Sequence, residues 1–202
     1  MIAEPARVNE LLPGRLLPEI LEAVQGRTHL RVLDLGFGVP ETIEFFSDRR
    51  CTLYFGGFHD ALKTARQPRP ADEAMDEDAW RALFRQAMPF GDDVRLDVCL
   101  FWDFLSYLDD MPLKVFIETL APYVDESTRA YGYALLKNDT SVLDRSYGIV
   151  DEAQLMVRSA RLGQLKAYPR PQARLAALMK GFTINRSVLR RDGLLEMAVR
   201  AG

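Results

Sequence analysis

Two residue types that build many active sites are scarce in this sequence. The chain of 202 residues has two cysteines, Cys51 and Cys99, and two histidines. Each cysteine lies within an apolar run that is typical of a strand. So few thiol and imidazole groups exclude a disulfide framework and predict no metal site. We expect both cysteines to be small buried hydrophobic residues.

A strong charge of one sign and a long apolar run are also missing. The net charge is −3 and the pI is about 5.5, so we expect neither a nucleic-acid partner nor attraction to an anionic membrane. Arg186, Arg190 and Arg191 flank a predicted hairpin and are interpreted as solvated strand ends. No apolar run approaches 18 residues and the first ten residues are not a signal peptide, which predicts a soluble cytoplasmic protein.

The overall composition is typical of one folded domain. With 48% hydrophobic and 27% charged residues, residues 1–202 form a single predicted domain. Apolar periodicity predicts helices at 14–25, 41–47, 76–88, 112–120 and 174–180, and strands at 29–35, 51–55, 94–102, 128–136, 182–189 and 194–200. Residues 147–158 form a small predicted hairpin, and 64–76 is the loosest predicted stretch. Strands alternating with helices predict an α/β Rossmann-like sandwich of three layers.

One motif indicates a ligand. In RVLDLGFGVPETIEFF, which begins at Arg31, a buried strand ends at Asp34, Gly36 and Gly38 form a turn, and a helix opens at Pro40. A glycine-rich turn between a strand and a helix N-terminus is a site for a nucleotide-like ligand. The glycines have a second reading, in which they permit tight packing of strand on helix. Asp34 likewise has a structural reading, in which a neighbouring loop N–H satisfies its carboxylate.

This motif and two later stretches resemble the class I S-adenosylmethionine-dependent methyltransferases. "LDVCLFWDFLSYLDD" at 96–110 is similar to their fourth strand and the segment after it, and "GFTINRSVLRRDGLLEMAV" to their closing strands. The resemblance covers about residues 15–200. It implies a mostly parallel seven-stranded sheet with a C-terminal antiparallel hairpin, and S-adenosylmethionine lying across the carboxyl ends of its strands.

The resemblance also implies roles for individual residues. Asp34, Gly36 and Gly38 would line the amino-acid end of the cofactor, while Trp102 and Asp103 would face the transferred methyl group. Asp103 could then serve as a general base. In its alternative reading, Asp103 caps a helix at 104–109.

The sequence departs from the family pattern at two places. Pro40 stands where a third glycine is usual, and it removes one backbone N–H. Gly56 and Gly57 stand where an acid would bind the ribose hydroxyls. Asp60 follows three residues late, and either reaches back to the ribose or caps a helix. A missing charged acceptor costs on the order of 1.5–3 kcal/mol, and each 1.4 kcal/mol is about tenfold in affinity.

Other residues keep two readings. Asp92 and Asp93 come before the fourth strand but align with no adenine-binding acid. Tyr107 and Tyr147 either line a substrate pocket or are half-buried packing residues. His59 either stands in for the lost acid or is a surface loop residue.

Three functions remain open at this stage. The first is a methyltransferase acting on a small molecule or a protein. The second is an inactive methyltransferase fold that serves as a binding or scaffolding module, a pseudoenzyme. The third is a dinucleotide-binding protein, which the same missing acid disfavours. The partner is a substrate, another protein or a second copy in a homodimer, and residues 138–170 are a candidate lid or partner surface. A cleft filled by the protein's own aromatic side chains would argue against the enzyme.

Overall fold

The computed structural model describes residues 9–68, 74–137, 145–160 and 165–202. Its strands are β1 (Asn9–Pro13), β2 (Leu30–Asp34), β3 (Cys51–Phe55), β4 (Val98–Trp102), β5 (Arg129–Leu135), β6 (Arg145–Asp151), β7 (Gln154–Ser159), β8 (Phe182–Leu189) and β9 (Leu194–Ala201). Its α-helices are α1 (Leu17–Ala23), α2 (Pro40–Ser47), α3 (Phe58–Ala65), α4 (Glu77–Ala87), α5 (Asp110–Leu120) and α6 (Gln172–Leu178), and short 3-10 turns are η2 (Phe104–Tyr107) and η3 (Ala121–Tyr123).

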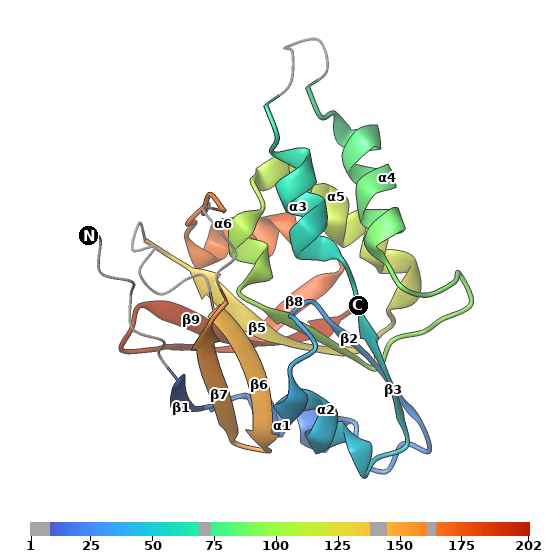
Figure 1. Cartoon of the computed structure of the whole chain (residues 1–202), viewed down its shortest axis with the longest axis vertical. Coiled ribbons are helices and arrows are strands. Elements are labelled where there is room, and N and C mark those ends of the chain that lie inside the picture. Colours follow the sequence, from blue (N-terminus) through green and yellow to red (C-terminus); the bar gives the residue numbers. More distant parts are fainter. Residues whose placement is uncertain (1–8, 69–73, 138–144, 161–164) are drawn as a thin grey trace.

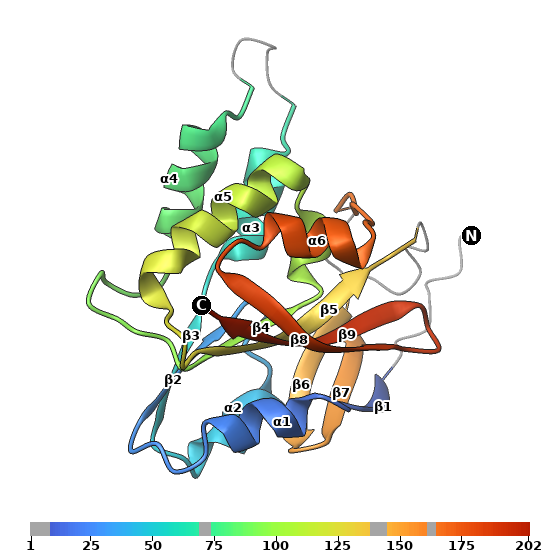
Figure 2. The ribbon, with the colours of Figure 1, turned by 180° about the vertical axis from the view of Figure 1, so that it is seen from behind.

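The central sheet has the strand order β3-β2-β4-β5-β9-β8. β2, β3, β4 and β5 run parallel, whereas β9 is antiparallel to both β5 and β8. Helices α1 and α2 cover one face and α3 to α6 the other (Figures 1 and 2). The α/β three-layer sandwich, the mostly parallel sheet and the C-terminal antiparallel hairpin are therefore confirmed.

The predicted number of strands is wrong by one. Within the described residues the central sheet has six strands instead of seven. Between β3 and β4 the described residues, 56–68 and 74–97, form α3, α4 and irregular segments, and none of them adds a strand to the sheet. β3 consequently has one neighbouring strand and forms an edge of the sheet.

The helices follow from local sequence signals. The N-cap of α4 is Asp76, whose side chain accepts a hydrogen bond of 2.8 Å from the Ala79 N–H, and two further acids lie in its first turn. Acids at this position satisfy free N–H groups and interact well with the helix dipole. α4 buries Trp80 and Phe84, which stack with ring centroids 5.5 Å apart. The helix predicted at 76–88 is therefore present.

A second, smaller sheet lies against the first, with the order β1-β7-β6. β6 and β7 form the hairpin predicted at 147–158, and β1, which the sequence did not indicate, pairs with β7 from Asn9↔Arg158 to Pro13↔Gln154. Of the stretch 138–170, residues 138–144 and 161–164 lie outside the described residues, as do 69–73 of the stretch 64–76. The hairpin packs on α2, beside the carboxyl ends of the central strands (Figure 1).

One hydrophobic core joins both sheets and the helices. Both cysteines are free thiols, Cys99 buried and Cys51 only partly so. Within the described residues no group of acids, histidines and cysteines is arranged to hold a metal ion. In that same part of the chain no helix has the length and apolar character needed to cross a bilayer.

Candidate functional site

The chain order of the strands reverses at one point of the central sheet. β2 is followed by β3 on one side, and β4 then pairs with the other side of β2. In open α/β sheets, ligands bind at such a switch point, beside the carboxyl ends of the strands. Asp34 ends β2 and Trp102 ends β4, so the topology brings together the two stretches that the sequence singled out.

Asp34 is a buried acid with two donors. Its side chain is 1% exposed. Its Oδ1 accepts hydrogen bonds of 2.6 Å from the Gly36 N–H and 2.6 Å from the Trp102 indole Nε1–H. Burial raises the pKa of Asp34 to about 6, against the lowering effect of these two hydrogen bonds. The sequence allowed for a loop N–H that would satisfy the Asp34 carboxylate, and the Gly36 N–H is that donor. The Trp102 indole is a second donor, which the sequence did not indicate.

Trp102 occupies the space beside Gly36. A Cβ atom added to Gly36 would lie 3.0 Å from Cδ1 and 3.0 Å from Nε1 of the indole. Trp102 has φ = 47°, in the left-handed region that non-glycine residues rarely adopt. A register irregularity between Leu100 and Trp102 in the pairing of β4 with β5 accompanies this turn of the backbone. The end of β4 is thus bent so that the indole lies over the glycine turn.

Tyrosines from the neighbouring strands hold the indole in place. The Tyr147 ring stacks on it with centroids 5.2 Å apart and 5° between the planes, and Tyr133 stacks on Tyr147 at 5.2 Å. Tyr131 meets the indole edge-on at 5.9 Å. All three tyrosines and Trp102 are buried. Stacked aromatic side chains therefore fill the space between β4, β5 and β6.

Asp103 lies next to this stack and is 2% exposed. Its Oδ2 accepts hydrogen bonds from the hydroxyls of Tyr107, at 3.1 Å, and Tyr147, at 3.5 Å. Burial raises the pKa of Asp103 to about 7, although the Tyr107 hydrogen bond favours the charged form. Asp103 stands at the N-cap position of η2, but its side chain forms no capping hydrogen bond, so the prediction of side-chain capping is wrong. The half-buried packing expected of both tyrosines is also wrong, because they are buried and bound to Asp103.

The glycine turn and the start of α2 are covered as well. Gly38 has φ = 61°, and an added Cβ would lie 3.4 Å from the Phe55 ring. β6 packs on the first turn of α2, where the Ile149 N–H donates to Thr42 Oγ1 at 3.1 Å. Arg158 of β7 forms an ion pair with Glu41 of the same turn. The helix N-terminus is therefore already in contact with the protein's own residues.

The residues after β3 differ from the sequence predictions. α3 begins at Phe58, and its N-cap is Gly57, so the reading of Asp60 as an N-cap is wrong. The Asp60 side chain is 86% exposed and pairs with Lys63 at 3.4 Å. His59 is 6% exposed in α3, and its ring packs at a tilt on Phe37 with centroids 4.5 Å apart, which corrects the prediction of a surface loop residue. Burial lowers the pKa of His59 to about 4.

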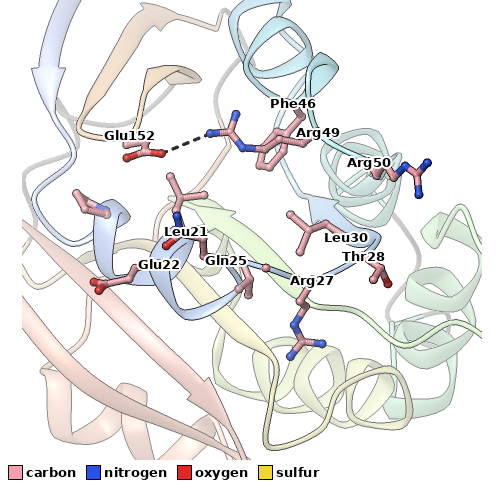
Figure 3. A pocket seen from close by; sticks show the side chains of 13 residues that line it. Leu21, Glu22, Gln25, Arg27, Thr28, Leu30, Phe46, Arg49, Arg50 and Glu152 are labelled. Atoms are coloured by element: carbon pink, nitrogen blue, oxygen red, sulfur yellow. Dashed lines mark hydrogen bonds and ion pairs between the residues drawn. The ribbon is translucent and has the colours of Figure 1, made fainter.

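The larger cavities lined by described residues lie elsewhere. One of about 670 Å³ is bordered by α1, the end of α2 and Glu152 in the turn between β6 and β7. In Figure 3, Arg49 extends toward Glu152, whereas Arg27 and Arg50 point away from the cavity. A second cavity, of about 490 Å³, lies between α3 and α4. Neither is lined by Asp34, Gly36, Trp102 or Asp103.

Comparison with known proteins identifies the fold. No family model and no curated protein matches the sequence. A methyltransferase dependent on S-adenosylmethionine from Clostridium acetobutylicum superposes with a TM-score of 0.52 over 95% of this chain and 93% of its own, at 13% identity. The 1,6-didemethyltoxoflavin-N1-methyltransferase of Burkholderia thailandensis gives 0.50 over 93% and 77%, at 15% identity. This chain has the class I methyltransferase fold.

A third structure with this fold is longer. The mitomycin 7-O-methyltransferase superposes with a TM-score of 0.50 at 17% identity, over 93% of this chain but only 54% of its own length. This chain thus spans about half of that protein. At identities this low, the comparisons establish the fold, and the chemistry must be argued from this chain's own residues.

The arrangement of the methyltransferase cleft does not fit S-adenosylmethionine. Beside Gly36, where the amino-acid end of the cofactor was expected, lies the Trp102 indole. After β3, where an acid was expected for the ribose, a Cβ at Gly56 would lie 2.0 Å from the Phe58 ring, and Asp60 points to solvent. Cofactor-binding roles for Asp34, Gly36, Gly38 and Asp60, and catalytic roles for Trp102 and Asp103, stay predictions.

Proposed function

We propose that this protein uses the methyltransferase fold as a binding module for another protein and does not transfer methyl groups. One observation carries the proposal. The Trp102 indole lies on Gly36 and donates to the buried carboxylate of Asp34 at 2.6 Å. The space that glycine leaves for a ligand is thereby used for internal packing.

The energetic cost of opening the cleft supports this proposal. A ligand at Gly36 would have to break the hydrogen bond between Trp102 and Asp34, worth about 1.5–3 kcal/mol because the acceptor is charged. It would also separate the stacked rings of Trp102 and Tyr147, worth about 0.5–1.5 kcal/mol. A total of about 3 kcal/mol weakens binding by roughly a hundredfold. The missing ribose acid weakens it further.

A protein partner is favoured by apolar side chains left in solvent. Phe37, Ile43 and Val150 are 41%, 45% and 42% exposed. They come from the glycine turn, α2 and β6, three neighbouring segments at the covered end of the sheet. Exposed apolar side chains on neighbouring segments support a protein-binding surface there, because such surfaces are rich in apolar groups.

One observation favours the enzyme as a second candidate. Asp103 combines burial, a pKa of about 7 and two tyrosine hydroxyls at the carboxyl end of β4. A carboxyl group that titrates near neutral pH can accept a proton from a substrate, and such groups are concentrated in active sites. The second candidate requires that Trp102 leave Gly36 when the cofactor binds.

The movement of Trp102 distinguishes the two functions. The chain has two tryptophans, so a Trp80→Phe variant leaves Trp102 as the only indole. Titration with S-adenosylmethionine and S-adenosylhomocysteine should change neither its fluorescence nor the calorimetric heat up to about millimolar ligand. A Trp102→Phe variant controls for fluorescence changes that arise from the ligand. Micromolar binding with a shift of the Trp102 emission would overturn the binding-module proposal and support the enzyme.

A further inference from the structure

The outer edge of β3 carries backbone groups without partners. β3 pairs with β2 only. The Leu30 N–H donates to the Arg50 carbonyl at 2.8 Å, so the backbone groups of even-numbered residues point toward β2. Because these directions alternate along a strand, the N–H and C=O of Cys51, Leu53 and Phe55 point outward. No hydrogen bond joins these outward groups to any described residue.

Other strand edges in the described residues are protected. β8 has a register irregularity between Ile184 and Arg186 and carries that arginine at its middle. β1 ends in Pro13. The N–H of Ile149 in β6 is bound to α2. Bulges, charges, prolines and covering helices are the means by which proteins keep strand edges from pairing with other chains.

β3 has no bulge, charge or proline, and the end of α4 approaches the chain only beyond Phe55, where the Ala87 carbonyl would lie 2.8 Å from a Cβ added at Gly56. The sequence of β3, CTLYF, contains no charged residue and no proline, and its pairing with β2 is regular from Leu30↔Cys51 to Asp34↔Phe55. An apolar, regular strand with a free edge is suited to pair with another strand. The edge is therefore an interaction surface.

We propose that β3 pairs antiparallel with β3 of a second copy of this chain, with Leu53 opposite Leu53 of the partner, so that one sheet continues through both chains. In this register Cys51 faces Phe55 of the other copy. The outward groups of all three odd-numbered residues then find partners in about six hydrogen bonds. Side chains of equal parity remain on the same face, so the apolar positions 51, 53 and 55 of both copies adjoin. A twofold arrangement of this kind closes on itself.

Charge favours a second copy in the antiparallel direction. Arg50, at the start of β3, is exposed and comes opposite Gly56 of the other copy. Gly57 follows Gly56 and borders open space. The exposed Asp60 carboxylate lies in the first turn of α3, three residues after Gly57. The antiparallel register therefore brings the Arg50 guanidinium toward the Asp60 carboxylate, which Lys63 also contacts at 3.4 Å, whereas a parallel register would place Arg50 beside Arg50. This proposal concerns assembly and holds whether or not the cleft binds a cofactor.

A proline substitution tests the edge. Leu53→Pro removes an outward N–H and no hydrogen bond to β2, so the strand can keep its place in the sheet. A strand pairing is smaller than a standard interface, which predicts a dimer of wild type with a micromolar dissociation constant. By sedimentation equilibrium the wild type should dimerise and Leu53→Pro should be monomeric. Ser187→Pro on β8 is the matched control, because its N–H also points away from the neighbouring strand, and it should still dimerise.

A cross-link tests the register even if the proline variant does not fold. In the double variant Cys51→Ser and Leu53→Cys, the new thiols of two copies face each other and should form a disulfide-linked dimer under mild oxidation. The wild type should not, because its Cys51 thiols would be about 14 Å apart and Cys99 is buried. A monomeric wild type, a Leu53→Pro dimer as stable as that of wild type, or cross-linking of wild type through Cys51 would each overturn the proposal.

Discussion

At the scale of single residues, buried acids whose hydrogen-bond donors are all neutral are the unusual feature of this protein. Asp34 and Asp103 are almost fully buried, and their partners are an indole, a backbone N–H and tyrosine hydroxyls. Neutral donors stabilise a carboxylate less than a cation would, so burial dominates and raises both pKa values. Holding these groups ionised at neutral pH costs folding free energy.

Asp103 therefore makes stability depend on pH. Its pKa is about 7 in the folded protein against 3.8 for the free side chain. Below about pH 4 both states bind the proton, and as the pH rises toward 7 only the folded state retains it, so the free energy of unfolding falls. Asp103→Asn removes this loss. It should raise the free energy of unfolding about 2 kcal/mol more at pH 8 than at pH 5, measured by urea denaturation.

The comparison with wild type at each pH isolates this effect. His59, whose folded pKa of about 4 lies below 6.5, acts with the opposite sign and destabilises the protein as the pH falls. It is present in both proteins and cancels in the difference. The exposed Asp78→Asn change on α4 is the matched control for loss of one carboxylate. Equal effects of Asp103→Asn at both pH values would contradict the buried position of this carboxyl group.

At the scale of elements, the contact between β6 and α2 decides how the cleft is filled. Gly148 of β6 lies where an added Cβ would be 2.9 Å from the Glu41 carboxylate and 3.0 Å from Val39. Tyr147, the adjacent residue, stacks on Trp102. The close approach of β6 to α2 at Gly148 thus places the Tyr147 ring in the cleft.

A larger side chain at Gly148 should push the hairpin away from α2. Gly148→Val should lower the free energy of unfolding by about 1–3 kcal/mol, because an overpacked contact forces the backbone to shift. It should also increase the solvent exposure of Trp102, seen as a red shift of its emission in a Trp80→Phe background. Gly57→Ala, which adds a methyl group to open space out of contact with the hairpin, should leave the Trp102 emission unchanged. An unshifted spectrum in Gly148→Val would mean that the hairpin does not hold the indole.

The sequence predicted the elements better than it predicted their contacts. Patterns around Asp34 and along β4 identified the strands, because these signals are local. Tyr147 was placed correctly in a hairpin, but its contact with Trp102 joins positions 45 residues apart and leaves no local signal. The left-handed conformation of Trp102 was equally hidden, since tryptophan does not favour it. The strand count came from the resemblance alone and failed where this chain departs from the family.

At the scale of the whole molecule, one buried carboxylate ties distant parts of the chain together. Glu196 on β9 is fully buried, and its Oε1 accepts from the Leu16 N–H at 2.8 Å and the Tyr131 hydroxyl at 2.8 Å. Leu16 directly precedes α1, and Tyr131 lies on β5. Three separate segments thus share one acceptor in the core.

Loss of that acceptor should weaken the entire domain. Glu196→Ala leaves two buried donors and a small cavity, and should lower the free energy of unfolding by about 3 kcal/mol while the transition remains a single one in calorimetry. Glu196→Gln keeps one acceptor oxygen and should cost less. A Glu196→Ala protein as stable as wild type, or one that melts in two steps, would show that the three segments are not coupled through this residue.

The position of β9 also has a consequence for the order in which the molecule assembles. The strand is made last among those described, yet it lies inside the sheet, between β5 and β8. Until residues 194–201 leave the ribosome, β5 has an unpaired side and the Leu16 amide has no acceptor. The sheet and the Leu16 hydrogen bond can therefore form only after the end of the chain has been made. Pairings between such distant positions slow folding, so a newly made chain keeps one side of β5 open to unwanted pairing until its last strand is available.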